Sequence, residues 1–145
     1  MSNVSIVTLG VADLARSTAF YEALGWRNTT ASQPTITFLQ GPRPGGGLVL
    51  GLFPRDKLAE DAEVADEPSG FRAVTLAFNR PSREDVDAFF EQARAAGASE
   101  VKKPQAVFWG GYSGYFADPD GHLWEIAHNP FFEMSDDGTL TLETT

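Results

Sequence analysis

Residues 109–130 read WGGYSGYFADPDGHLWEIAHNP, and this stretch decides the fold. At its centre, residues 118–121 are Asp, Pro, Asp and Gly, a combination that favours a tight turn. Aromatic and aliphatic side chains that suit strands lie on both sides of the turn. The stretch therefore predicts a β-hairpin with strands at about 111–117 and 122–128. Its second strand carries Glu125 and both histidines of the chain, His122 and His128.

The elements predicted around this hairpin follow one order twice. In each half a strand leads into a helix with its own predicted N-cap, Asp13 in the first half and Ser82 in the second. Three more strands complete each half. The predicted strands cover residues 4–11, 26–30, 35–40 and 47–53, then 72–79, 99–107, 111–117 and 122–128. The second helix is expected to bury the apolar residues Val86, Phe89, Phe90 and Ala93.

Short sequence matches show that the two halves are related. Val-Thr-Leu at 7–9 recurs at 74–76, and AFYE at 19–22 matches AFFE at 88–91. An internal repeat of this length indicates two copies of one βαβββ module. We predict an α+β fold in which two four-stranded sheets, each with one helix, curve around a central cleft. The predicted single domain spans residues 1–145, with module one at about 4–53, a connector at 54–70, module two at about 71–128 and a C-terminal tail at 129–145.

Composition limits the classes of function. The 145-residue chain is 42% hydrophobic, which is enough for one domain with a core. Its formal net charge of −9 argues against a nucleic-acid partner, because phosphate binding needs a basic surface. No signal peptide and no apolar run of ~20 residues is visible, so we expect a cytoplasmic protein without a membrane partner. The absence of cysteine excludes disulfides and thiolate metal sites.

The sequence resembles the vicinal oxygen chelate superfamily, which includes glyoxalase I, extradiol dioxygenases, fosfomycin-resistance transferases and bleomycin-resistance proteins. The resemblance covers residues 4–130. It rests on LGVADLARSTAFYEALGW at 9–26, the paired βαβββ order and YFADPDGHLWEI at 115–126. It implies that the two modules form a U-shaped cup that binds a ligand, and that the protein is a homodimer.

The resemblance also identifies the positions where metal-dependent members carry ligands. Those members place three or four His or Glu side chains in the cup. The matching positions here are Ile6, its repeat mate Ala73, and Glu125, of which only Glu125 can bind a metal. Residues 31–55 contain no Asp, Glu, His or Cys, so the last strand of the first module supplies no ligand.

One carboxylate does not hold a divalent ion. Catalytic zinc sites and the 2-His-1-carboxylate iron site each need three protein ligands. Strand alternation places His122 and His128 on the face opposite Glu125, so neither histidine completes the set. We therefore expect no cofactor, and a divalent metal is disfavoured.

Glu125 has three interpretations. As a candidate catalytic residue it would act as a general base. It could equally anchor a cationic ligand, or form hydrogen bonds within the protein without taking part in chemistry. His122 and His128 are each expected to be ordinary strand-end residues, although His128 could also line a pocket mouth or a dimer interface.

The other candidate ligand-binding residues are polar or aromatic side chains on the predicted strands. Aromatic walls suit planar or apolar ligands, and tyrosine hydroxyls fix their orientation. The acidic surface favours a cation. We therefore predict that a small aromatic or cationic molecule contacts Thr8, Phe38, Gln40, Trp109, Tyr112, Tyr115 and Glu125.

Three functional hypotheses follow from the residues and the resemblance. The first is a metal-independent small-molecule-binding protein of the bleomycin-resistance type, with its ligand in an aromatic-lined cup. The alternative is an enzyme of the superfamily, either a glyoxalase-like lyase or isomerase or an extradiol dioxygenase. Such an enzyme would need an atypical metal site or metal-free acid–base chemistry by Glu125. The third is a structural or regulatory protein whose own side chains fill the cup.

Overall fold

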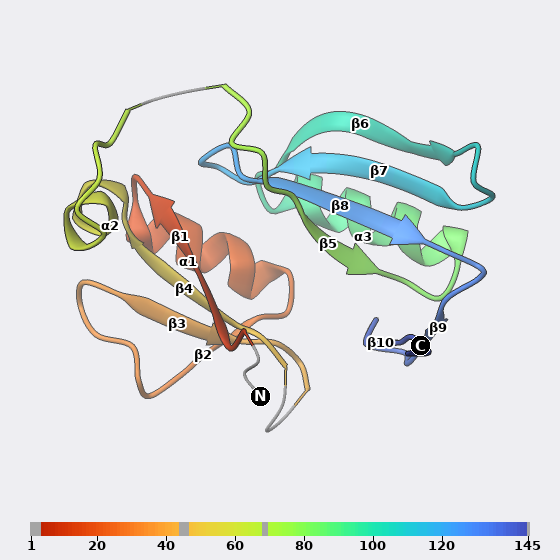
Figure 1. Ribbon diagram of the computed structural model, residues 1–145, viewed down its shortest axis with the longest axis horizontal. Helices are drawn as coiled ribbons and strands as arrows, with labels where there is room; N and C mark the ends of the chain where they lie inside the picture. Colours follow the sequence, from red (N-terminus) through yellow and green to blue (C-terminus); the bar gives the residue numbers. More distant parts are fainter. Residues whose placement is uncertain (1–3, 44–46, 68–69, 145) are drawn as a thin grey trace. The chain divides into compact units, whose positions relative to one another are not determined.

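The structure, a computed structural model, describes residues 4–43, 47–67 and 70–144. Its contacts divide the chain into two units, Met1–Arg72 and Ala73–Thr145. Each unit contains a four-stranded sheet with one long helix against one face (Figure 1). The strand orders are β1-β4-β3-β2 and β5-β8-β7-β6, so the two halves share one topology. This confirms the predicted α+β fold of two βαβββ modules.

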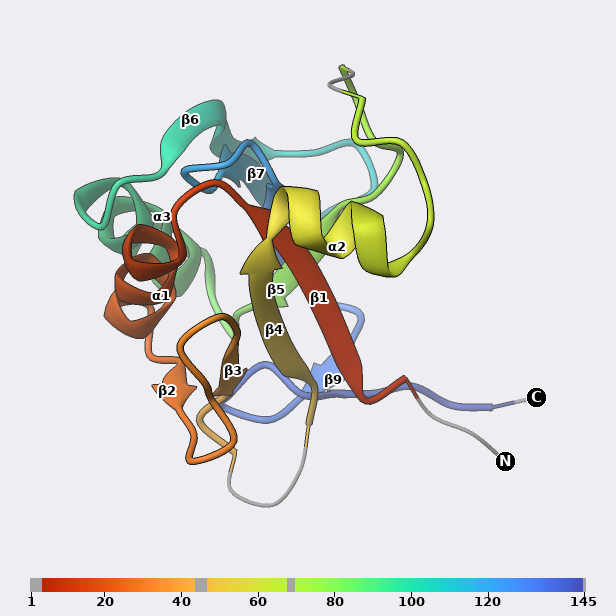
Figure 2. The same ribbon diagram turned by 90° about the vertical axis from the view of Figure 1, so that its left-hand side faces the viewer.

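The first unit follows the predicted order and adds a second helix. Its elements are β1 (Ile6–Val11), α1 (Leu14–Ala23), β2 (Arg27–Asn28), β3 (Thr37–Gln40), β4 (Val49–Pro54) and α2 (Arg55–Asp61). Asp13 caps α1 as predicted, because its carboxylate accepts a hydrogen bond from the backbone N–H of Arg16 at 3.0 Å. The helix buries Phe20 and Tyr21 in the core of this unit. Figure 2 shows the same ribbon turned by 90°, with β1, β4 and α2 of this unit labelled.

The second unit repeats this plan. Its elements are β5 (Leu76–Asn79), α3 (Arg83–Ala95), β6 (Ser99–Ala106), β7 (Tyr112–Ala117), β8 (Leu123–His128), β9 (Glu133–Met134) and β10 (Leu140–Thr141). Ser82 caps α3 by accepting a hydrogen bond from the Asp85 backbone N–H at 3.1 Å. The helix buries all four residues predicted for its apolar face. Within the described residues, no helix is long and apolar enough to cross a membrane.

The predicted hairpin at residues 111–128 is confirmed. The buried Asp118 carboxylate accepts hydrogen bonds from the backbone N–H groups of Asp120 and His122, at 2.9 and 2.8 Å. Gly121 adopts a φ of 86°, a conformation that glycine reaches without steric cost. The turn fixes an antiparallel register in which Tyr115 is paired with Glu125.

Strand β5 is shorter than predicted. The sequence predicts a strand over residues 72–79, but the strand begins at Leu76. Ala73 has a φ of 60°, in the left-handed region, and a residue in that region cannot continue an extended strand. The predicted strand therefore loses its first four residues, 72–75.

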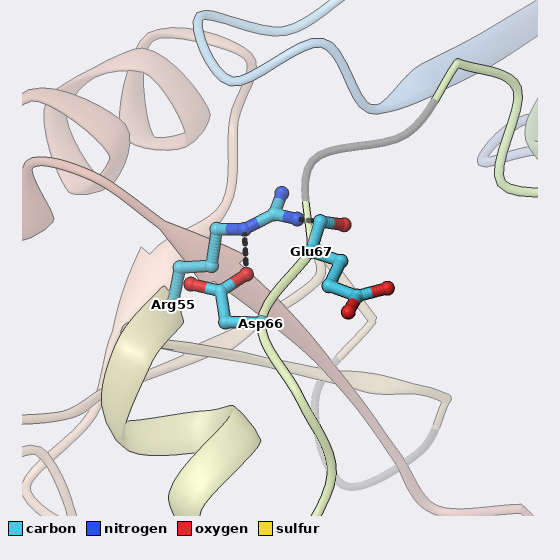
Figure 3. A network of polar contacts seen from close by, with 3 residues as sticks. All are labelled: Arg55, Asp66 and Glu67. Atoms are coloured by element: carbon cyan, nitrogen blue, oxygen red, sulfur yellow. Dashed lines mark hydrogen bonds and ion pairs between the residues drawn. The ribbon is translucent and has the colours of Figure 1, made fainter.

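The predicted connector at residues 54–70 contains a helix that is bound to the first unit. Helix α2 covers two turns of this connector. Its first residue lies against β1, because a Cβ added to Gly10 would lie 3.2 Å from the Cα of Arg55. Arg55 Nε donates to Asp66 Oδ1 at 2.5 Å and Nη2 donates to the Glu67 carbonyl at 3.5 Å (Figure 3). These bonds tie the chain that follows the helix back to the helix.

The C-terminal tail forms a hairpin of its own. The sequence predicts that the tail either adds an edge strand or lies over a neighbour. Among the described strands, β9 and β10 pair only with each other, so the tail adds no edge strand to either sheet. Gly138 in their turn lies against the carbonyl oxygen of Asn79, so this hairpin contacts the end of β5.

Candidate functional site

Each sheet has a face that packs against its long helix, and the opposite face is here called the open face. In the first sheet, Thr37 faces α1, because its hydroxyl oxygen lies 2.9 Å from that of Thr18. The next residue, Phe38, therefore points to the open face. The strand register places eight other residues on this open face, namely Ile6, Thr8, Gly10, Arg27, Gln40, Val49, Gly51 and Phe53.

A cavity of about 380 Å³ lies on the open face of the first sheet. Its volume falls within the ~300–1,000 Å³ that is usual for small-molecule sites. Two predicted contact residues, Phe38 and Gln40, meet in its wall, whereas Thr8 lies on the same face outside the lining. The lining residues are Ile6, Thr29, Ala31, Phe38, Gln40 and Val49.

The loop at residues 29–36 forms one wall of this cavity, and hydrogen bonds to β3 hold it in place. The Thr29 hydroxyl donates to the Phe38 carbonyl at 2.9 Å. The Ser32 hydroxyl accepts from the Phe38 backbone N–H at 2.8 Å and donates to Asn28 Oδ1 at 2.5 Å. Because these bonds are made within the protein, the wall is ordered before a ligand binds, and preorganisation of this kind favours affinity.

Sequence reasoning missed Thr29 and Ala31 as lining residues. The available signal was the Thr and Ser content of the loop, which is typical of side chains that bond to nearby backbone. That signal indicates a turn, but it does not indicate toward which face of the sheet the turn folds.

The second sheet carries a hydrogen-bonded pair on its open face. Phe78 and Trp124 lie on the helix face, since the Phe78 ring is 4.7 Å from that of Phe89 in α3 and 4.5 Å from that of Trp124. Alternation then places Glu125 on the open face, beside its register partner Tyr115. The Tyr115 hydroxyl donates a hydrogen bond to the Glu125 carboxylate, and both residues are half-buried.

This environment raises the pKa of Tyr115 above its ordinary value of 10. Desolvation by burial is the main cause, followed by the charge of Glu125 and the hydrogen bond to it. The folded protein therefore holds the phenol proton more tightly than the unfolded chain does. The resulting contribution to stability is complete below pH ~10 and is lost as pH rises through the folded pKa.

We predict that Glu125→Gln lowers the pKa of Tyr115 toward its ordinary value. The variant removes the negative charge and keeps the shape of the side chain, so the contribution of burial remains. The measurement is a pH titration followed by ¹³C NMR of ring-labelled tyrosine. Asp87→Asn is the matched control, because it should lower the pKa of Tyr112 and leave Tyr115 unchanged. An identical Tyr115 titration in Glu125→Gln and wild type would contradict the pairing.

The structure does not bring Tyr112 together with Tyr115 and Glu125. The Tyr112 hydroxyl donates to Asp87 Oδ1 of α3 at 2.7 Å, and the Arg83 guanidinium lies 5.2 Å from the centre of its ring. The hydrogen bond to Asp87 is the main cause of its raised pKa. Tyr112 therefore lies on the helix face of the second sheet, opposite the face that carries Tyr115 and Glu125.

Trp109 and His128 also lie apart from the pair. Trp109 is in the turn between β6 and β7, which is closed by a hydrogen bond from the Val107 N–H to the Gly111 carbonyl at 3.0 Å. The Nδ1 atom of His128 is 3.0 Å from the carbonyl oxygen of Arg80, so this imidazole bonds to backbone of its own unit. Neither residue contributes to the cavity of the first sheet.

The donor groups present do not fit a metal site of the kind that the superfamily resemblance implies. In residues 4–43, 47–67 and 70–144, no three His, Asp or Glu side chains form a group that could hold a metal ion. Ile6 lies on the open face of the first sheet and Ala73 precedes β5, and neither side chain has a donor atom. These residues support no chemical step through a metal.

Comparison with known proteins identifies relatives over most of the chain. Residues 4–126 match the sequence model of the Glyoxalase/Bleomycin resistance protein/Dioxygenase superfamily. The chain is similar to a glyoxalase-related enzyme from Fulvimarina pelagi, with 36% identity over 99% of this chain and 100% of that chain, and a TM-score of 0.84. No curated protein matches its sequence.

Two further solved structures share the fold. One is a glyoxalase/bleomycin resistance protein/dioxygenase from Nocardioides, with 29% identity over 88% of this chain and 83% of that chain, and a TM-score of 0.71. The other is a family enzyme from Burkholderia phytofirmans PsJN, with 24% identity over 88% of this chain and 98% of that chain, and a TM-score of 0.77.

Proposed function

The chain belongs to the glyoxalase/bleomycin resistance protein/dioxygenase superfamily, and on this premise we propose that it is a small-molecule-binding protein of the bleomycin-resistance type that works without a metal. The cavity of the first unit is the observation that carries the proposal. It has the volume of a ligand site, mostly apolar walls and a loop held in place by hydrogen bonds. A planar molecule stacked on Phe38 is the ligand that such walls favour.

The chemistry of the side chains supports binding without a metal. Glu125 is the only residue with a donor group among the three positions that match metal ligands of relatives. Its hydrogen bond from Tyr115 gives the carboxylate a partner within the protein. The proposal also includes the partners expected from the sequence, which are a small aromatic or cationic molecule and a second copy of the chain in a homodimer, and it places the protein in the cytoplasm.

We expect aromatic ligands to bind equally well with and without EDTA, and to bind about tenfold more weakly to Phe38→Ala. The variant removes the ring on which the ligand stacks, and truncation of a central aromatic contact usually costs more than ~1 kcal/mol. A thermal-shift screen of planar aromatic compounds would find ligands, and isothermal titration calorimetry would give Kd. Phe108→Ala is the matched control, because Phe108 is fully exposed in the second unit.

Elemental mass spectrometry of the same samples tests directly whether the protein binds a metal ion. Untagged protein would be incubated with nickel, zinc, manganese or iron(II) and then desalted. A stoichiometric metal that disappears in Glu125→Ala would contradict the proposal. Loss of ligand binding in EDTA would contradict it as well.

A second candidate function is an enzyme that uses acid–base chemistry without a metal. The pair of Tyr115 and Glu125 favours it, because a carboxylate hydrogen-bonded to a phenol can accept a proton while the phenol donates one. The relative from Fulvimarina pelagi is described as a glyoxalase-related enzyme. If the pair is catalytic, Glu125→Gln lowers turnover about tenfold or more.

A further inference from the structure

We infer that the cavity of the first unit takes an uncharged planar ring whose edge carries a hydrogen-bond donor next to an acceptor, as in a lactam or a primary carboxamide. This inference rests on the proposed function and names the ligand class of that cavity. It narrows the aromatic or cationic molecule expected from the sequence to an aromatic ligand without charge.

The lining offers no charged partner to a charged ligand group. None of its six lining residues has an ionisable side chain. Along the chain, residues 31–54 contain one ionisable side chain, Arg43, and no carboxylate that would balance a cation. A charge taken out of water without a partner is strongly disfavoured, so an uncharged ring is the better occupant.

Gln40 supplies the carboxamide that would form hydrogen bonds with the edge of the ring. Its half-buried side chain points to the open face and lines the cavity. In the described part of the chain, the Gln40 carboxamide makes no hydrogen bond to another residue. A carboxamide presents an N–H donor beside a carbonyl acceptor, so it pairs best with a ligand edge that offers both. Leaving these groups unpaired beside a bound apolar surface would weaken binding.

Two neighbouring polar side chains each donate a hydrogen bond to backbone. The Thr29 hydroxyl donates its proton to the Phe38 carbonyl at 2.9 Å. Arg27 is the register partner of Gln40 in β2, but its guanidinium donates to the Pro42 carbonyl at 3.4 Å and is not part of the lining. Gln40 is therefore the lining side chain with an unused donor and an unused acceptor together.

Three probes with one ring system test this inference: 2-naphthamide, which is neutral, 2-naphthamidine, which is cationic, and 2-naphthoate, which is anionic. We expect wild-type protein to bind 2-naphthamide about tenfold more tightly than either charged probe, measured as Kd by calorimetry. Gln40→Leu should remove this preference by weakening 2-naphthamide about tenfold. Gln40→Glu should reverse it in favour of 2-naphthamidine, because the new carboxylate pairs with the amidinium.

Gln105→Leu is the matched control, since this exposed glutamine lies on β6 of the second unit and should leave all three Kd values unchanged. Circular dichroism would confirm that each variant is folded. Tighter binding of a charged probe, lost in Phe38→Ala, would overturn the inference and leave the proposed function standing. Unchanged binding of 2-naphthamide to Gln40→Leu would also overturn the inference. If none of the probes binds while the thermal-shift screen finds another aromatic ligand that Phe38→Ala weakens, the inference fails and the proposed function stands.

Discussion

Replacing Trp124 by alanine is expected to lower the free energy of unfolding by about 3–5 kcal/mol, the usual range for a large aromatic residue in a core. Trp124 is 3% exposed and lies at the centre of the helix face of the second sheet. Its ring stacks on Phe78 at 4.5 Å, and Phe78 in turn contacts Phe89 of α3. Truncation would leave a cavity between β5, β8 and α3 that these rigid rings cannot fill.

Urea unfolding followed by far-UV circular dichroism would measure this loss. Phe108→Ala provides the baseline, because a fully exposed side chain should change the free energy of unfolding by no more than about 0.5 kcal/mol. A loss below about 1 kcal/mol in Trp124→Ala would show that the stack of Trp124 and Phe78 does not hold the second unit together.

Replacing Gly114 by valine is expected to lower the free energy of unfolding by about 3 kcal/mol, which is the second large effect. A Cβ at this position would lie 2.7 Å from both the Lys102 carbonyl oxygen and the Pro104 nitrogen. Both are backbone atoms of β6, so the clash cannot be relieved by turning a side chain. The register of β6 against β7 shifts between Lys102 and Gln105, which shows that β6 bulges where it passes Gly114.

The same unfolding measurement tests this prediction. Gly70→Val is the matched control, because a Cβ at Gly70 meets no atom within 4 Å and its φ is not in the left-handed region. The control should change the free energy of unfolding by less than about 0.5 kcal/mol. Equal stability of the two variants would mean that the bulge in β6 adapts to a larger residue at position 114.

The two open faces have different chemistry, and this difference separates the candidate functions. The first sheet has a cavity with one unused carboxamide, at Gln40, and no ionisable side chain in its lining. The second sheet has a phenol that keeps its proton and donates to a carboxylate, in Tyr115 and Glu125. Variants at Gln40 therefore test recognition of a neutral ring, whereas variants at Glu125 test proton transfer.

The sequence determined the fold because the signals that define it act over short distances. The turn at residues 118–121 depends on hydrogen bonds to the carboxylate of Asp118 and on the positive φ of Gly121. Both features are predictable from the types of these four residues. The N-caps Asp13 and Ser82 each bond to a backbone N–H three residues later. With the repeat, these local rules were enough to predict two modules of one topology.

The sequence also identified part of the candidate site. Phe38 and Gln40 were predicted as ligand contacts, and they meet in one cavity because alternation along β3 puts both on the same face. Tyr115 and Glu125 are brought together by the register that the predicted turn imposes. Alternation along the strand was sufficient for the first pair, whereas the second pair also needed the register set by the turn.

The remaining features were decided by tertiary structure. Alternation separates Tyr112 from Tyr115, but only the packing of α3 determines that Tyr112 is the one that bonds to the helix. The cavity wall at Thr29 and Ala31 depends on the direction in which a loop folds across the sheet. The need for glycine at position 114 depends on how closely the backbone of β6 passes. These properties depend on contacts between segments that are far apart along the chain or on three-dimensional packing, which no local pattern of residues encodes.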